Sequence, residues 1–149
     1  MSSGFLLDTS VLSMLAPGRP APSGRLTAWL RQNDNEIYIS AVTIAEIEQG
    51  ICKLRRAGGA ERAEALAQWL GALLAEGAAR ILPLDAAVGR VAGRLSDEAT
   101  AVGRHPSFPD VAIAATAVAH ELVVVTGNGR HFAPLGIAFI EPGEALPDR

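Results

Sequence analysis

The chain has 149 residues, of which 49% are hydrophobic and 19% charged, so it fits one folded domain and lacks the composition of a disordered chain. Thirteen basic residues against 16 acidic ones give a net charge of −3, which excludes a general electrostatic attraction to nucleic acid and limits any such contact to local patches. A single cysteine excludes an internal disulfide and a multi-cysteine metal cluster. No basic leader and no apolar run of about 18 residues is visible, and we therefore expect a soluble cytoplasmic protein without a membrane segment.

The first half of the chain alternates short apolar runs with helical periodicity. The run that ends at Asp8 predicts a strand, and a short helix follows it. Residues 16–23 contain three prolines and are predicted to be a loop. The later elements predicted in this half are a helix around Trp29, a strand at 37–40, and a helix at 43–56 that ends before Gly58 and Gly59.

The second half continues the same alternation. The predicted elements are helices at 61–76, 85–102 and 110–121, a strand at 81–84 weakened by Pro83, a β-branched strand at 123–126, and a last strand at 137–140. Strands separated by helices predict an α/β fold with a central parallel sheet of four to five short strands covered on both sides. We expect one domain over residues 1–141 and a loose tail over 142–149.

Three acidic residues lie in apolar surroundings. Asp8 ends the first strand, Glu46 lies inside an isoleucine-rich helix beside Thr43 and Gly50, and Asp110 opens an almost entirely apolar helix. Asp8 and Asp110 also have a purely structural interpretation, because acidic residues at helix starts satisfy free backbone N–H groups.

Sites in parallel α/β sheets form where the carboxyl ends of strands turn into helices. Asp8, Thr126 and Asn128 are predicted at that edge, and the helices that carry Glu46 and Asp110 begin beside it. Converging carboxylates repel one another unless a cation compensates, so a divalent metal is the economical explanation. Ligands that offer only oxygen favour Mg²⁺ or Mn²⁺ over zinc.

Four sequence blocks resemble the PIN-domain ribonucleases, in particular the VapC/FitB-like toxins of bacterial toxin–antitoxin pairs. In chain order they are FLLDTSVLSML, ISAVTIAEIEQGI, FPDVAIAATAVAHELVVVT and TGNGRHFAPLGI, which together span nearly the whole length. The resemblance implies a PIN-like α/β/α sandwich, metal ligands Asp8, Glu46 and Asp110, and Mg²⁺- or Mn²⁺-dependent cleavage of RNA. It further implies a homodimer and a small VapB-like antitoxin as partners, with a hetero-oligomer on DNA as a further assembly.

The last block departs from the family pattern, in which Thr-Arg is followed by Asn or Asp and by another Asp three residues later. Here Gly127 replaces the Arg, Asn128 takes the position that is often acidic, and His131 replaces the later Asp. Asn128 is retained as a catalytic candidate because its amide oxygen can bind a metal or a water. The absence of the fourth acid counts against tight binding of a second metal.

The mechanism implied by the resemblance is attack on phosphorus by a metal-activated water, leaving a 5′-phosphate and a 3′-hydroxyl. Thr9, Ser10 and Thr126 are supporting candidates, since their hydroxyls orient water or phosphate; turn and cap chemistry explains them equally well. The basic side chains have two possible interpretations: they contact the RNA backbone, or they belong to solvated helix faces. These residues are Arg25, Arg31, Lys53, Arg55, Arg56 and Arg130. His105 and His131 have no carboxylate partner by spacing.

Two other functions stay open from the residues alone. A PIN fold that has lost turnover serves only as a binding module for RNA or antitoxin, and the missing fourth acid motivates this alternative. A receiver-like phosphotransfer domain that uses Asp8 as nucleophile is disfavoured. Such domains usually have a second acid two residues after the first, and here that position is Ser10. For the dimer, the apolar stripes of helices 44–54 and 61–74 are the expected surface.

Overall fold

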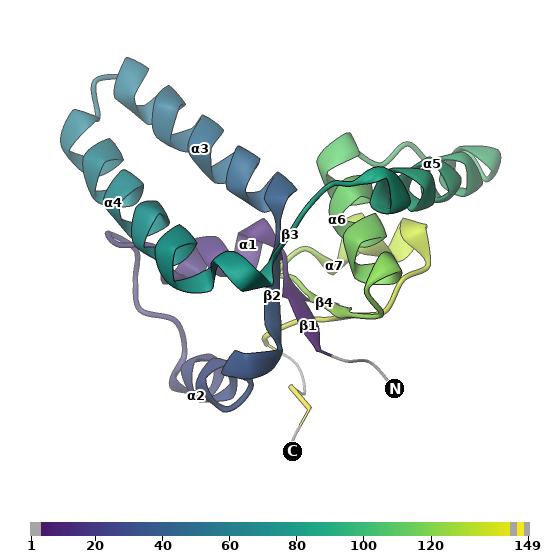
Figure 1. Cartoon of the computed structure of the whole chain (residues 1–149), viewed down its shortest axis with the longest axis horizontal. Coiled ribbons are helices and arrows are strands. Elements are labelled where there is room, and N and C mark those ends of the chain that lie inside the picture. The colour runs from purple at the N-terminus through teal and green to yellow at the C-terminus, as the bar shows by residue number, and fades with distance from the viewer. Residues whose placement is uncertain (1–3, 144–145, 148–149) are drawn as a thin grey trace.

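The computed structural model describes residues 4–143 and 146–147 (Figure 1). The strands are β1 (Phe5–Leu7), β2 (Ile37–Ser40), β3 (Ile81–Leu82), β4 (Val123–Val125) and β5 (Phe139–Ile140). The α-helices are α1 (Thr9–Leu12), α2 (Gly24–Gln32), α3 (Ala41–Arg56), α4 (Ala60–Gly77), α5 (Ala86–Ala101), α6 (Phe108–Ala119) and α7 (Gly129–Phe132). The α/β alternation expected from the sequence is confirmed.

The five strands form one sheet in the order β3-β2-β1-β4-β5, and every pairing is parallel. In the centre of the sheet, Leu7 of β1 is in register with Ile39 of β2 and with Val125 of β4. The carboxyl ends of the three central strands therefore lie level at one edge. This edge is where the candidate site is expected.

Helices cover both faces of the sheet. Leu6 and Val124 point into one core with α5, α6 and α7. Leu7 and Val125, the next residues along the same strands, point into a second core with α1, α2 and the sheet-facing parts of α3 and α4. Because successive strand residues face opposite sides, continuous apolar runs are required here. The α/β/α sandwich is thus confirmed.

Helices α3 and α4 form a hairpin that projects from the carboxyl edge of the sheet, with α5 on the other side of the molecule (Figure 1). Ile51, Ala63 and Leu70 are buried between the two helices of the hairpin. A Cβ atom at Gly59 would lie 2.6 Å from Leu54 Cδ1, so a larger residue at this turn would force the Leu54 side chain to move. The apolar stripes of these helices, which are the dimer surface expected from the sequence, therefore pack largely against each other.

The larger exposed apolar side chains near α5 and α6 are Leu84, Val102, Phe108 and Val118.

Helix α6 begins two residues earlier than the sequence predicts. It starts at Phe108, with Pro109 in its first turn, and the Ser107 side chain caps it by accepting the Asp110 N–H. Proline breaks a helix in its interior, but in the first turn its missing N–H costs nothing. Seven consecutive residues of α6 from Val111 are buried, which explains its continuous apolar sequence.

Part of the tail expected to be loose is packed. Leu146 is buried in the core beneath α2, and the Trp29 indole N–H donates to the Pro147 carbonyl at 3.2 Å. Residues 144, 145, 148 and 149 of that tail lie outside the described residues. Among the helices that the structure describes, none is long and apolar enough to cross a membrane.

Candidate active site

Strand β1 and strand β4 end side by side, and each is followed by a polar residue. The Asp8 backbone N–H donates to the Val125 carbonyl at 2.9 Å, which continues the ladder between the two strands. Asp8 and Thr126 consequently meet, although 118 positions separate them in the sequence.

Asp8 is only 5% exposed, and two hydroxyls hold its carboxylate. Ser10 Oγ and Thr126 Oγ1 each donate to Asp8 Oδ2 at 2.8 Å. Asp8 stands at the N-cap position of α1, but its side chain makes no capping hydrogen bond there. The helix-cap interpretation therefore does not account for this residue. A buried carboxylate needs hydrogen-bond donors, and both donors here act on the same oxygen.

The two hydroxyls also anchor the loop that follows β4. Ser10 Oγ accepts the Gly127 N–H, and Thr126 Oγ1 accepts the Asn128 N–H, both at 2.9 Å. Each hydroxyl thus connects Asp8 to the backbone of this loop. Asn128 is half-buried, and its side chain makes no capping hydrogen bond with α7.

Glu46 reaches the same region from α3, which begins directly after β2 with Ser40 as its N-cap. Thr9 Oγ1 donates to Glu46 Oε1 at 2.7 Å and also lies 3.0 Å from Thr43 Oγ1. The residue next to Asp8 in the chain therefore orients Glu46. Thr43 and Glu46 lie three residues apart on one face of α3, and both contact the Thr9 hydroxyl.

Asp110 lies in the first turn of α6, and its helix is capped by Ser107 instead of by Asp110 itself. Its Oδ2 atom lies 3.5 Å from His131 Nδ1, and the two side chains are 22% and 44% exposed. Sequence spacing paired His131 with no carboxylate. The four-residue helix α7 that carries His131 is too short to show a periodic pattern in the sequence.

The three acids share the carboxyl edge of the sheet, because α3 leaves that edge and α6 starts near it before running back to β4. Each nevertheless has a separate partner: hydroxyls for Asp8, Thr9 for Glu46, and His131 for Asp110. Across residues 4–143 and 146–147, no three side chains of His, Cys, Asp or Glu are close enough to hold a metal ion. Carboxylates and hydroxyls are oxygen donors of the kind that Mg²⁺ and Mn²⁺ prefer, so the donor chemistry fits such an ion. Their assembly around one ion stays a prediction.

A groove of about 470 Å³ leads away from Thr9 and Glu46 along successive turns of α3 as far as Ala57. Its basic lining residues are Arg19, Lys53 and Arg62, and its larger apolar ones include Leu66 and Trp69.

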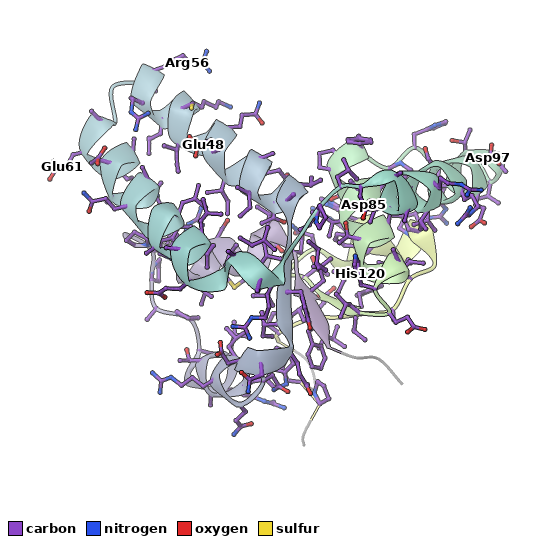
Figure 2. The ribbon with its side chains drawn as sticks, viewed as in Figure 1. Glu48, Arg56, Glu61, Asp85, Asp97 and His120 are labelled. Carbon is purple, nitrogen blue, oxygen red and sulfur yellow. The ribbon has the colours of Figure 1, made fainter. Side chains whose placement is uncertain are left out.

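The basic candidates from the sequence are distributed widely over the molecule. Lys53 alone among them lines this groove; Arg25 and Arg31 lie on α2, Arg130 lies on α7, and Arg55 and Arg56 lie in the last turn of α3. Figure 2 shows Arg56 at the tip of the hairpin, remote from the sheet. Sequence reasoning missed Arg19 and Arg62, which no local pattern distinguishes from solvated side chains.

Glu141 is a further acid at this edge that was not predicted from the sequence. It directly follows β5 and accepts the Gly129 N–H at 3.1 Å. The signal that identified Asp8, an acid at the end of an apolar strand, was also present here. The signal is hard to recognise at Glu141, because the polar residues that follow it are typical of a loose tail.

Comparison with known proteins agrees with this architecture. The family model of the PIN domain matches residues 5–136. Toxin FitB of Neisseria gonorrhoeae is 34% identical over 139 residues, which cover 93% of this chain and 97% of that protein. VapC ribonuclease Y4jK of Sinorhizobium fredii is 33% identical over 141 residues, which cover 94% and 98%.

A solved structure of FitAB bound to an IR36 DNA fragment superposes with a TM-score of 0.72 at 31% identity, covering 97% of this chain and 99% of that one. The PIN-domain match over residues 5–136 begins at β1 and continues past α7, so Asp8, Glu46 and Asp110 all lie within it. The chain belongs to the PIN-domain family, among the FitB- and VapC-like toxins of toxin–antitoxin systems.

Proposed function

We propose that this chain is a divalent-metal-dependent endoribonuclease that hydrolyses RNA phosphodiester bonds with an activated water. The observation that carries the proposal is the Asp8 carboxylate, which is buried at the carboxyl edge of the sheet and held by two hydroxyls on one oxygen. A relative of similar length is named a ribonuclease, which supports the same activity here.

Asp8, Glu46 and Asp110 are the residues that would hold Mg²⁺ or Mn²⁺. When bound, such an ion would polarise the scissile phosphate and lower the pKa of a water molecule. Ser10 and Thr126 keep Asp8 oriented through their hydrogen bonds to Oδ2. Thr9 does the same for Glu46. Asn128, in the adjoining loop, would offer its amide oxygen to the ion or to its water.

The groove along α3 provides a path for the RNA strand. Arg19, Lys53 and Arg62 are the cations that would neutralise successive phosphates, and Glu46 is the only acid among the lining residues that the structure describes. Trp69 offers a partly exposed aromatic surface to a base. The chain as a whole carries a net charge of −3 and does not attract RNA in general, so binding would depend on local cations such as these.

Regulation of the proposed ribonuclease activity would require a protein partner. The related FitAB structure is bound to DNA, and we extend that assembly to this chain as a complex with a small VapB-like antitoxin. A second copy of the chain would cover the exposed apolar side chains near α5 and α6, among which Phe108 is 64% exposed and Val102 is 70% exposed. Such a toxin acts in the cytoplasm, where its RNA substrate is found.

The competing function is a PIN fold that binds RNA or antitoxin without cleaving. His131 in place of the family's later acid, and the separate partners of the three acids, favour this alternative. The presence of all three carboxylates at one edge favours the enzyme.

The deciding experiment measures cleavage of RNA by the purified chain with Mn²⁺, with Mg²⁺ and with a chelator. Glu46→Gln should lower the rate by at least about 10²-fold, since a lost catalytic charge is worth several kcal/mol. Glu48→Gln is the matched control, because Glu48 lies exposed on the same helix (Figure 2). This variant should cleave RNA like the wild type. Cleavage that persists in the chelator, or in Glu46→Gln, would contradict the proposed mechanism. RNA binding without cleavage in any metal would establish the binding module instead.

A further inference from the structure

Glu141 connects two segments at the carboxyl edge of the sheet. It follows β5, and its Oε1 accepts the backbone N–H of Gly129, the first residue of α7, at 3.1 Å. The preceding residue, Asn128, makes no side-chain cap for α7. The first N–H group of this short helix is therefore satisfied by a carboxylate from another element.

Residue 129 has to be glycine for this contact to form. Gly129 is buried, and a Cβ atom placed there would collide with Glu141 Oε1 and would lie 2.5 Å from Phe139 Cε2. The missing side chain thus leaves space that the Glu141 carboxylate and the Phe139 ring occupy. The close approach is a property of both positions together.

The segment that Glu141 holds carries two groups of the candidate site. On one side of Gly129, the Asn128 N–H donates to Thr126 Oγ1, which in turn donates to Asp8. On the other side, His131 Nδ1 lies 3.5 Å from Asp110 Oδ2. A shift of Gly129 would therefore move the segment relative to two of the three acids.

The structure assigns to Glu141 the role of a positioning residue: by accepting the Gly129 N–H it fixes the start of α7, and thereby holds Asn128 against Thr126 and His131 against Asp110. Glu141 acts through this hydrogen bond and not through contact with the RNA. The assignment rests on the proposed ribonuclease function for its kinetic consequence, but not for the hydrogen bond itself.

The kinetic test compares Glu141→Ala, which removes the acceptor, with Glu141→Gln, whose amide oxygen can accept the same N–H. Displacement of site groups by about 1 Å costs about 10²-fold in rate, so Glu141→Ala should lower kcat by at least about tenfold while KM for RNA changes less than about twofold. Glu141→Gln should retain kcat within about threefold, and Glu48→Ala is the exposed control. Wild-type kcat in Glu141→Ala overturns the assignment. Equal loss in Glu141→Gln also overturns it, because the charge and not the hydrogen bond would then matter.

A second measurement needs neither metal nor RNA. Hydrogen exchange of the Gly129 amide, followed by NMR, should accelerate at least about tenfold in Glu141→Ala and stay close to wild type in Glu141→Gln. The His131 ring resonances should shift in the alanine variant alone. Unchanged exchange in Glu141→Ala overturns the positioning role even if the variant loses activity. Conversely, if the wild type cleaves no RNA, the proposed function fails while the exchange data still decide the role of Glu141.

Discussion

Removing the Thr126 hydroxyl should destabilise the fold far more than the loss of one ordinary hydrogen bond. Thr126 is fully buried; its Oγ1 donates to Asp8 Oδ2 at 2.8 Å and accepts the Asn128 N–H at 2.9 Å. Thr126→Val keeps the shape but removes both bonds. A hydrogen bond to a charged group contributes about 1.5–3 kcal/mol and an unsatisfied buried group costs about 1–3 kcal/mol, so we expect a loss of about 3–5 kcal/mol. At about 2–4 °C per kcal/mol for a chain of this length, Tm should fall by about 6–20 °C.

Two variants separate this effect from general core disruption. Thr116→Val is the matched control, because Thr116 is equally buried but donates only to the Ala112 carbonyl in its own helix, so it should lose no more than about 1 kcal/mol. Thr126→Ser keeps the hydroxyl and loses one methyl group, for about 1 kcal/mol. Urea unfolding followed by circular dichroism, with chelator present, measures all three. A Thr126→Val protein within 1 kcal/mol of the wild type would refute the view that this hydroxyl holds the Asp8 carboxylate.

Four further predictions test the site and its surroundings. Asp110→Asn should abolish RNA cleavage but leave the urea midpoint nearly unchanged, because Asp110 does not cap its helix; retained cleavage would remove it from the site. Asn128→Asp should tighten Mn²⁺ binding in calorimetry, and an unchanged affinity would show that residue 128 does not face the ion. Lys53→Gln should weaken RNA binding and lower its salt dependence by about one ion, whereas the exposed Arg90→Gln on α5 should do neither. Phe108→Ser should reduce the mass measured by light scattering to that of a monomer; a wild type that is already monomeric would contradict the proposed dimer surface.

Local sequence patterns were sufficient for the order of elements and for the edge at which the acids lie. A β-branched run such as Val123 to Val125 is stable only with both faces buried, and a polar residue directly after such a run has to lie at a strand end. Asp8 and Thr126 were placed by this reasoning alone. Parallel strands bring their carboxyl ends to one edge whichever strands are neighbours, so the expectation needed no knowledge of strand order.

The partners of each acid were decided by the tertiary structure. Thr126 donates to Asp8 because β4 lies beside β1, and His131 lies against Asp110 because the start of α7 is held by Glu141. No spacing in the chain encodes these pairs, since each depends on strand order and on packing between segments remote in sequence. The apolar stripes of α3 and α4 show the same limit, because periodicity identifies an apolar face but does not say what covers it. Patterns along a chain determine which groups are buried or lie at an edge, whereas the pairing of those groups follows from the packing of the whole fold.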